Sequence, residues 1–228
     1  MNDTRAGGVW FRSPRPQRGG PPLTRERIVA EAIALLDQEG ITRLTMRRLA
    51  ERLGTGSTTL YWHVDTKEDV LDLALDAVFG EARLPAPSGD WRADITALIG
   101  EWQAAMLRHP WSAGLLGRPL LGPHVLERTE FLHATLIGAG LEGPHLAAAA
   151  YGLSHYVIGS AMTQAAWQDR DEPAAREAAD RHVRAHDDRY PTLARHGHLS
   201  GADWAATFDR GLGYLLDGIA ARLAHQGR

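Results

Sequence analysis

From Thr24 onward, apolar residues recur at the three- and four-residue spacing of amphipathic helices, and this pattern constrains the fold more than any other feature. Ile28, Ala32, Leu35 and Leu36 fall at i, i+4, i+7 and i+8. They lie between Thr24, a favourable helix N-cap, and a glycine that commonly ends a helix. No alternating apolar and polar run predicts a strand, and no repeat of 20 to 50 residues is visible. The chain is therefore predicted to be all-α.

The composition narrows the class of protein. Hydrophobic residues make up 44% of the 228 residues and charged residues 23%, close to the average for globular proteins. These values argue against wholesale disorder and against a polytopic membrane protein. Cysteine is absent, which excludes disulfides, cysteine nucleophiles and thiolate metal sites. Because residues 1–22 also lack the apolar core of a signal peptide, we expect a cytoplasmic protein.

Three segments are expected along the chain. Residues 1–22 are rich in Gly, Pro and Arg without any helical period, which predicts a disordered basic tail, either solvated or lying along DNA. The Pro- and Gly-containing stretch at 84–89 predicts a boundary between a domain at 23–83 and a larger one at 84–228. Formal charge is +4 over residues 1–64 and −7 over residues 65–228, which together give −3. This asymmetry indicates that the amino-terminal part meets a polyanion.

The amino-terminal domain has the layout of a helix-turn-helix. Thr45 can cap a second helix that ends at Gly54, and a short third helix follows near Ser57–Val64. A fourth helix begins at Thr66, with an aspartate three residues on that favours a capping box. In a helix-turn-helix the second of the paired helices enters the DNA major groove, so that helix must expose polar side chains and bury a few apolar ones. Leu60 and Val64, four residues apart, suit the buried face.

Small polar and aromatic residues of the third helix are the predicted base and phosphate contacts, and cations of the flanking helices supply the non-specific attraction. Lys67, the sole lysine, lies in a first helical turn where the macrodipole disfavours a cation. A phosphate partner would explain this placement, although a solvated lysine is the alternative. The DNA-binding residues predicted from this layout are Arg47, Arg48, Ser57, Thr58, Thr59, Tyr61, Trp62, His63 and Lys67.

The larger segment is predicted to be helical throughout, with one long helix from Trp91 to just before Pro110 and others over 123–138, 144–168, 173–190 and 203–225. Residues 143–168 contain no charged residue, but they hold many polar and small residues. A buried helix explains this composition better than a membrane span. The last helix carries a wide apolar stripe that suits both a core and a subunit interface.

Aromatic and apolar residues of the larger segment suggest a mixed apolar pocket for a small-molecule effector, although each of them is individually compatible with ordinary packing. The candidate effector-binding residues are Trp102, Arg118, Phe131, Tyr151, His155, Ile158, Met162 and Trp167. The candidate dimer-interface residues are Tyr156, Leu212, Leu215, Leu216 and Ile219.

Eleven histidines raise the question of a metal site. His182 and His186 are four apart on one helical face, a spacing compatible with two imidazole ligands. The surrounding residues are charged, which favours a solvated helix, and we expect neither a metal nor a cofactor.

At this point a resemblance is apparent. The run LTRERIVAEAIALLDQEGITRLTMRRLAERLG followed by STTLYWHVDTKEDVLDLALDAVF, residues 23–54 and 57–79, resembles the DNA-binding domain of the tetracycline-repressor family of transcriptional regulators. The most specific part is LYWHV with a lysine three residues on. The motifs RHPW at 108–111, GRP at 117–119, YGLSHYVIG at 151–159 and FDRGLGYLLDGI at 208–219 resemble the same subgroup.

The resemblance implies a homodimeric regulator with an amino-terminal helix-turn-helix domain and a larger domain that binds an effector and forms a four-helix dimer interface. It also implies operator contacts at Thr45 and at the DNA-binding residues named above other than Arg48, with Lys67 as a phosphate contact. Ser57 and Thr58 stand where tetracycline-type repressors have glutamine and proline, so a different operator sequence is expected. Leu115 stands near the place of their magnesium-binding histidine, which argues against a tetracycline–magnesium ligand.

The expected function is a ligand-responsive repressor that binds double-stranded operator DNA, acts as a homodimer without a membrane partner, and is not an enzyme. The alternative from a different class is a small all-α enzyme or carrier whose helix-turn-helix serves only for packing. No set of nucleophile, base and orienting residue stands out in the sequence to support that alternative.

Overall fold

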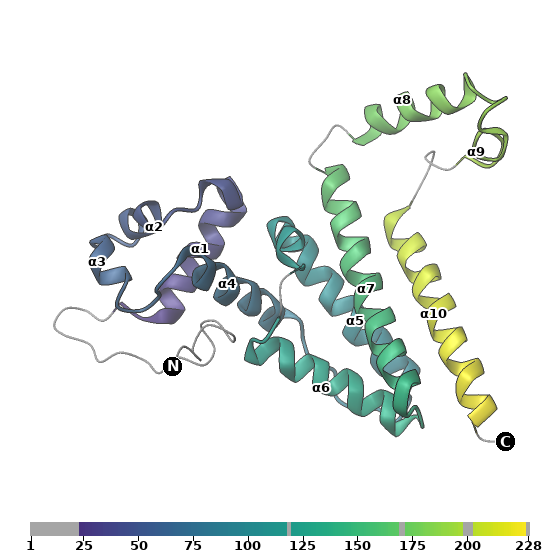
Figure 1. Ribbon diagram of the computed structural model, residues 1–228, viewed down its shortest axis with the longest axis horizontal. Coiled ribbons are helices and arrows are strands. Elements are labelled where there is room, and N and C mark those ends of the chain that lie inside the picture. Colours follow the sequence, from purple (N-terminus) through teal and green to yellow (C-terminus); the bar gives the residue numbers. More distant parts are fainter. Residues whose placement is uncertain (1–22, 118–119, 169–171, 198–202, 227–228) are drawn as a thin grey trace. The chain divides into compact units, whose positions relative to one another are not determined.

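The computed structural model describes residues 23–117, 120–168, 172–197 and 203–226, and every regular element within these ranges is a helix (Figure 1). The all-α prediction is confirmed. The predicted tail at 1–22 and the candidate effector residue Arg118 lie outside the described residues. Packing divides the chain into two compact units, Met1–Ala139 and Gly140–Arg228, which are described separately below.

The first unit begins with α1, Arg25–Glu39, which forms as predicted. The Thr24 hydroxyl accepts a hydrogen bond from the backbone N–H of Arg27, and Gly40 ends the helix at φ 76°, a conformation that glycine adopts without strain. The predicted apolar stripe of α1 is buried. A short 3-10 helix, η2 at Ile41–Arg43, then leads into α2, Met46–Arg52, which is capped by Thr45.

Two further helices complete the amino-terminal part. Helix α3 covers Ser57–Leu60, and α4 covers Lys67–Glu81. The predicted capping box at the start of α4 is present, because Thr66 and Asp69 each accept the other's backbone N–H. Helix α4 packs against α1 on one side and against the helices that follow it in the chain on the other.

Residues 84–89 form the predicted break, and Asp90 caps α5, Trp91–Arg108, by accepting the backbone N–H groups of Arg92 and Ala93. The chain continues through η3, Pro110–Leu115, to α6, Pro123–Gly138. Both α5 and α6 pack against α4. The expected domain boundary at 83/84 therefore falls inside the first compact unit, and as a functional division it stays a prediction.

Buried polar side chains join α4 and α6, one at the start of α6 and one at the end of α4. Asp76 of α4, 4% exposed, accepts the backbone N–H of Val125 at 3.0 Å and faces Nδ1 of His124 at 2.7 Å. Arg128 of α6, also 4% exposed, donates to the carbonyls of Gly80 and Ala82 at the end of α4. Each helix thus satisfies unpaired backbone groups at the end of the other.

The RHPW motif forms a second polar joint. Buried His109 bridges Asp37 of α1 and Glu81 of α4, with distances of 2.8 Å to Nδ1 and 3.0 Å to Nε2. The indole N–H of Trp111 donates to the same Asp37 carboxylate at 2.7 Å. Arg108 forms an ion pair with Glu81 at 3.0 Å. The segment between α5 and η3 is therefore tied to α1 and to α4.

The second unit contains α7 (Gly143–Gln168), α8 (Glu172–Arg184), α9 (Pro191–His196) and α10 (Trp204–Gln226), with α7 packed along α10 (Figure 1). The prediction of one helix over 173–190 was wrong about where the helix stops. Helix α8 stops at Arg184, and Pro191, which disfavours helical backbone at Tyr190, starts a separate short helix. None of the described helices has the length and hydrophobicity that a membrane crossing requires.

Candidate nucleic-acid interface

The segment Ser57–Val64, called here the reading head, follows α2 after a short turn. Helix α3 itself is short, but hydrogen-bonded turns extend its path as far as Val64. The backbone N–H of Val64 donates to the carbonyl of Leu60 at 3.2 Å. Leu60 is 0% exposed and Val64 is 1% exposed. The two predicted anchors therefore hold the segment against the core.

The other side chains of the reading head lie at the surface. Thr58 and Thr59 are exposed, Tyr61 is 45% exposed and Trp62 is 58% exposed, whereas Ser57 and His63 are half-buried. The segment thus presents hydroxyl groups and aromatic rings outward from a rigid base, which is the arrangement that major-groove readout requires.

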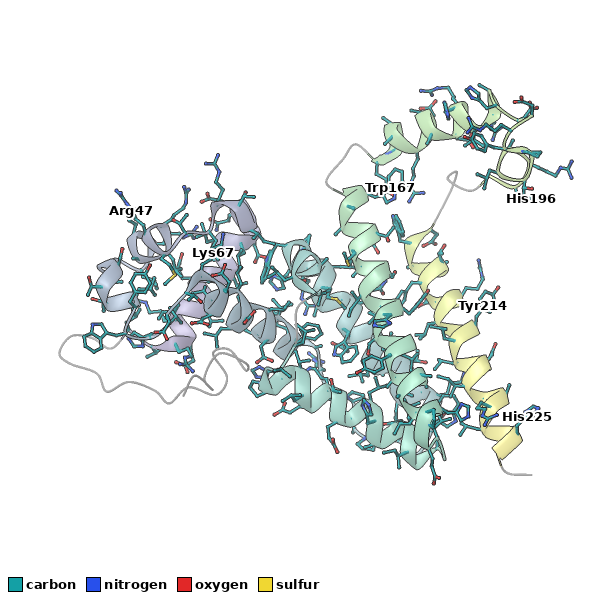
Figure 2. All side chains as sticks on the ribbon, in the orientation of Figure 1. Arg47, Lys67, Trp167, His196, Tyr214 and His225 are labelled. Carbon is teal, nitrogen blue, oxygen red and sulfur yellow. The ribbon has the colours of Figure 1, made fainter. Side chains whose placement is uncertain are left out.

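Helix α2 places three of the predicted contact residues. The Thr45 hydroxyl accepts the backbone N–H of Arg48 at 3.1 Å, so Thr45 is both a cap and an exposed side chain. Arg47 points outward from α2 (Figure 2) and pairs with Glu51 at 2.9 Å. Arg48 pairs with Glu39 of α1 at 2.6 Å. Both arginines are exposed, but each already has a carboxylate partner.

Lys67 lies at the start of α4, as predicted, and its ammonium donates to the carbonyl of Ile41 at 3.0 Å. Part of the explanation for a cation at this position is therefore an internal carbonyl. An ammonium carries three N–H donors, so this bond leaves two for a phosphate.

The pKa of His63 is lowered, first by burial and second by the positive charge of Arg25. A neutral imidazole is therefore favoured at this edge of the reading head, and it can accept as well as donate a hydrogen bond. Arg25 and Arg27 were not among the predicted contact residues. The guanidinium of Arg25 lies 3.5 Å from the carbonyl of His63, and that of Arg27 lies 3.4 Å from the carbonyl of Leu53. The sequence contained a signal that could have identified them as anion contacts, because both are cations in a first helical turn, as Lys67 is.

Two candidate effector residues belong to the first unit. Trp102 of α5 is 4% exposed and meets Phe79 edge to face, with ring centroids 6.0 Å apart. Phe131 of α6 is half-buried. Among the residues that the structure describes, the indole N–H of Trp102 and the hydroxyl of Ser112 are buried without a hydrogen-bond partner.

The remaining described effector candidates lie on α7, in the second unit. Tyr151 is stacked on His155 at 5.8 Å and both are exposed, as is Met162, whereas Ile158 is half-buried. The guanidinium of Arg176 lies over the ring of Trp167, 4.8 Å from the ring centroid. It also lies over the ring of Trp204 at the same distance. The effector assignment of all these residues stays a prediction.

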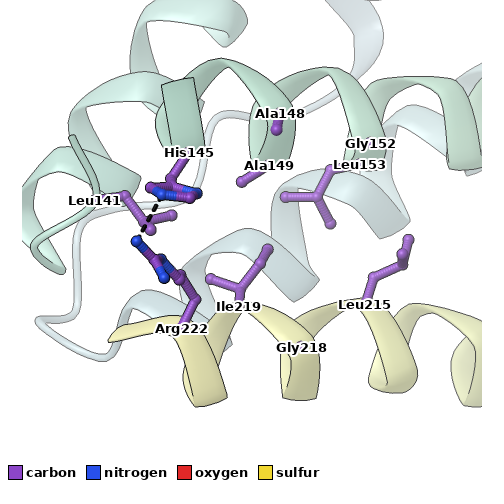
Figure 3. Close-up of a pocket in the computed structure, with 10 residues that line it drawn as sticks. All are labelled: Leu141, His145, Ala148, Ala149, Gly152, Leu153, Leu215, Gly218, Ile219 and Arg222. Carbon is purple, nitrogen blue, oxygen red and sulfur yellow. Dashed lines mark hydrogen bonds between the residues drawn. The ribbon is translucent and has the colours of Figure 1, made fainter. Parts of the chain in front are cut away.

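The dimer candidates have roles within the subunit. The Tyr156 hydroxyl donates to the carbonyl of Phe208 at 2.8 Å, and burial raises the pKa of this phenol. Leu212 and Leu216 are each 2% exposed between α7 and α10. Leu215 and Ile219 line a hollow of about 220 Å³ between these two helices (Figure 3).

One end of the hollow is basic, because Arg222 lines it. The guanidinium of Arg222 donates to Nε2 of His145 at 2.6 Å. The other lining residues are small or aliphatic, so the hollow is apolar along most of its length. A role of this face in dimerisation stays a prediction.

The candidate imidazole pair is present on the surface of α8 and the turn after it. The rings of His182 and His186 are 4.4 Å apart, and both are exposed. Within the described ranges, no group of three or more histidine or acidic side chains is arranged to hold a metal ion.

Comparisons with known proteins agree with this geometry. Residues 28–74 match the family of bacterial regulatory proteins, tetR family, and residues 84–223 match the tetracycline-repressor-like C-terminal domain. An HTH-type transcriptional regulator of Saccharopolyspora erythraea is 49% identical over 217 residues, which cover 94% of this chain and 92% of that relative. The HTH-type transcriptional repressor DrrR1 of Streptomyces coeruleorubidus is 35% identical over 96% of this chain and 85% of its own length.

The fold is shared with solved structures as well. ActR, a TetR family protein of Streptomyces coelicolor solved in complex with actinorhodin, superimposes with a TM-score of 0.81 at 29% identity, over 89% of this chain and 99% of ActR. Three findings agree. Both segments of the chain match the same family, relatives match it over nearly its full length, and the reading head is exposed on a buried base. The chain belongs to the tetR family of bacterial transcriptional regulators.

Proposed function

We propose that this regulator is a homodimeric repressor that binds operator DNA through its reading head and is released by a small apolar or amphipathic molecule. The observation that carries the DNA-binding role is the contrast within one segment: Leu60 and Val64 are almost fully buried, while Thr58, Thr59 and Trp62 face outward. The relative named a repressor, DrrR1, supports the direction of regulation.

A homodimer follows from the geometry of the target. Two reading heads must lie about 34–36 Å apart to enter successive major grooves on one side of a duplex. Of the candidate dimer residues, the partly exposed Leu215 and Ile219 of α10 would contribute to the contact between two subunits. An effector that changes the spacing abolishes DNA binding without touching the DNA.

The ActR complex with actinorhodin supports a small molecule as the effector. In this chain the buried, unpartnered indole N–H of Trp102 is a donor that an effector oxygen could satisfy. Moving the regulator from 99:1 to 1:99 in favour of the released state requires a preference of about 5.5 kcal/mol for that state. An apolar ligand of drug size can supply this preference through burial alone.

Two further parts of the proposal concern setting and chemistry. We propose that the chain acts in the cytoplasm, where it would meet its DNA target, and that it acts by binding rather than by catalysis. Relatives named as a transcriptional regulator and a repressor support this proposal. Residues 23–83 would form the DNA-binding domain and residues 84–228 the effector-binding and dimerisation domain.

The test is binding of genomic DNA fragments to immobilised protein, followed by measurement of affinity for the retained fragment. Trp62→Ala should weaken binding at least tenfold without lowering the thermal midpoint, since its ring is exposed. Leu193→Ala, an exposed apolar residue of α9, is the matched control and should bind as the wild type does. Retention of no fragment by the wild type would overturn the proposal.

A further inference from the structure

The basic side chains of residues 23–83 fall into two groups. One group is ion-paired: Arg47 with Glu51, Arg48 with Glu39 and Arg52 with Glu31. The other group has no ion-pair partner among the described residues and consists of Arg25, Arg27, Arg43, Lys67 and Arg83. The positive charge that this part of the molecule offers to an anion therefore comes mainly from the second group, and Arg47 and Arg48 are not in it.

Arg25 and Arg27 are held beside the reading head by its own backbone. The guanidinium of Arg25 lies at the carbonyl of His63, near the end of the reading head, at 3.5 Å. That of Arg27 lies at the carbonyl of Leu53, just before the turn that leads into the reading head, at 3.4 Å. Both hydrogen bonds are long and their acceptors are neutral carbonyls. Each guanidinium therefore keeps its full charge, and most of its N–H donors stay available for a phosphate.

The position of these two arginines is unfavourable for α1 on its own. Both lie in the first turn of the helix, where the macrodipole disfavours cations. The single acid of that turn, Glu26, has its pKa lowered first by backbone and Thr24 hydrogen bonds, and the charge of Arg25 is a smaller cause. External anions near these positions would compensate for both cations.

From these contacts we propose that Arg25 and Arg27 bind operator phosphates on the two sides of the reading head and supply more of the salt-dependent affinity than Arg47 and Arg48 do. The inference rests on the proposed function and extends it to residues of α1. A guanidinium without an ion-pair partner displaces DNA counterions when it meets a phosphate. An arginine that already has a carboxylate partner must give up that partner first, so its net contribution is smaller.

The salt dependence of binding separates the two pairs. Each phosphate contact contributes about 0.9 to the slope of log K against log salt, so four contacts in a dimer contribute about 3.6. Arg25→Gln/Arg27→Gln should therefore reduce the magnitude of the slope by about 3.6, and Arg47→Gln/Arg48→Gln should reduce it by clearly less. Between 0.1 and 0.2 M salt, the affinity deficit of the first variant should shrink about twelvefold.

The assay is fluorescence anisotropy with the DNA fragment that the wild-type protein retains, over a series of KCl concentrations. Arg83→Gln is the control for net charge, because Arg83 is exposed and unpaired but lies beyond the far end of α4, about 22 Å along the helix from Lys67. It should leave the slope close to that of the wild type. Arg25→Lys/Arg27→Lys keeps the charges and should restore most of the slope, which a loss of folding would not allow.

A wild-type slope in Arg25→Gln/Arg27→Gln, with specific DNA binding retained, would overturn this inference and leave the proposed function standing. A reduction half as large by Arg83→Gln would also overturn it, since this variant removes half as many charges and net charge alone would then explain the effect. Failure of the wild type to bind any fragment would overturn the proposed function, and the inference with it.

Discussion

Gly122→Ala tests the joint between α4 and α6. A Cβ at Gly122 would lie 2.1 Å from Oδ1, 2.2 Å from Cγ and 2.6 Å from Cβ of Asp76. Because Cβ of Asp76 is itself too close, no rotamer of the aspartate relieves the overlap, and the two helices must move apart. The backbone of Gly122, with φ −70° and ψ 152°, suits alanine, so the substitution isolates the steric contact.

The magnitude follows from the bonds that this separation breaks. Asp76 would lose the backbone N–H of Val125 and the ring of His124, and hydrogen bonds to a charged group contribute about 1.5–3 kcal/mol each. The expected loss is therefore about 3–6 kcal/mol, a large part of the roughly 5–15 kcal/mol that stabilises a typical domain. For a chain of this size the thermal midpoint should fall by roughly 6–24 °C.

The measurement is thermal unfolding followed by circular dichroism, with urea unfolding as a second probe. Gly100→Ala is the matched control, since a Cβ there meets nothing within 4 Å and alanine favours the middle of α5 by up to about 1 kcal/mol. Asp76→Ala should not rescue Gly122→Ala, because the aspartate Cβ remains in place. A Gly122→Ala midpoint within about 2 °C of the wild type would refute the account of this joint.

Three other outcomes are expected. Thr66→Ala removes the hydroxyl that caps α4 and should lower the free energy of unfolding by about 0.5–2 kcal/mol in urea titration; no change would contradict the cap's contribution. Gly211→Ala would place a Cβ 2.2 Å from the hydroxyl of Tyr156, so overpacking should cost about 1–3 kcal/mol, seen as a lower thermal midpoint; an unchanged midpoint would show that α7 and α10 adjust freely. The pKa of His63 is lowered from 6.5 by burial and by Arg25, so below that pH the unfolded chain takes up a proton that the folded chain resists, and the free energy of unfolding should fall as the pH falls. His63→Gln should reduce this dependence between pH 7.5 and 5.5, and equal pH profiles for the two proteins would exclude the contribution.

Local features of this fold could be predicted from the sequence because neighbours in the chain determine them. The caps at Thr24, Thr45, Thr66 and Asp90 each act within three residues, and the apolar periodicity of α1 needs only the chain itself. The anchoring of the reading head by a pair of residues four apart was predictable for the same reason.

The long-range polar contacts could not be predicted in this way. His109 is separated from Asp37 by 72 residues, and Asp76 from Val125 by 49. Nothing in the local pattern of either residue identifies its partner. The same limit applies to the ion pairs of Arg47 and Arg48: sequence analysis selected both as cations for DNA without showing that carboxylates of α1 and α2 already neutralise them.

The carboxylates of Asp37, Asp76 and Glu81 have a consequence for exchanging parts between regulators. All three belong to the segment before residue 84, and their partners lie on the segment after it. A hybrid regulator joined at 83/84 would bring a foreign α5 and α6 against these acids and strand them without donors unless the matching histidines came along. A junction at 139/140 keeps every one of these pairs within a single parent. The effector candidates Trp102 and Phe131 would then come from the same parent as the reading head, so such a hybrid exchanges only the later helices.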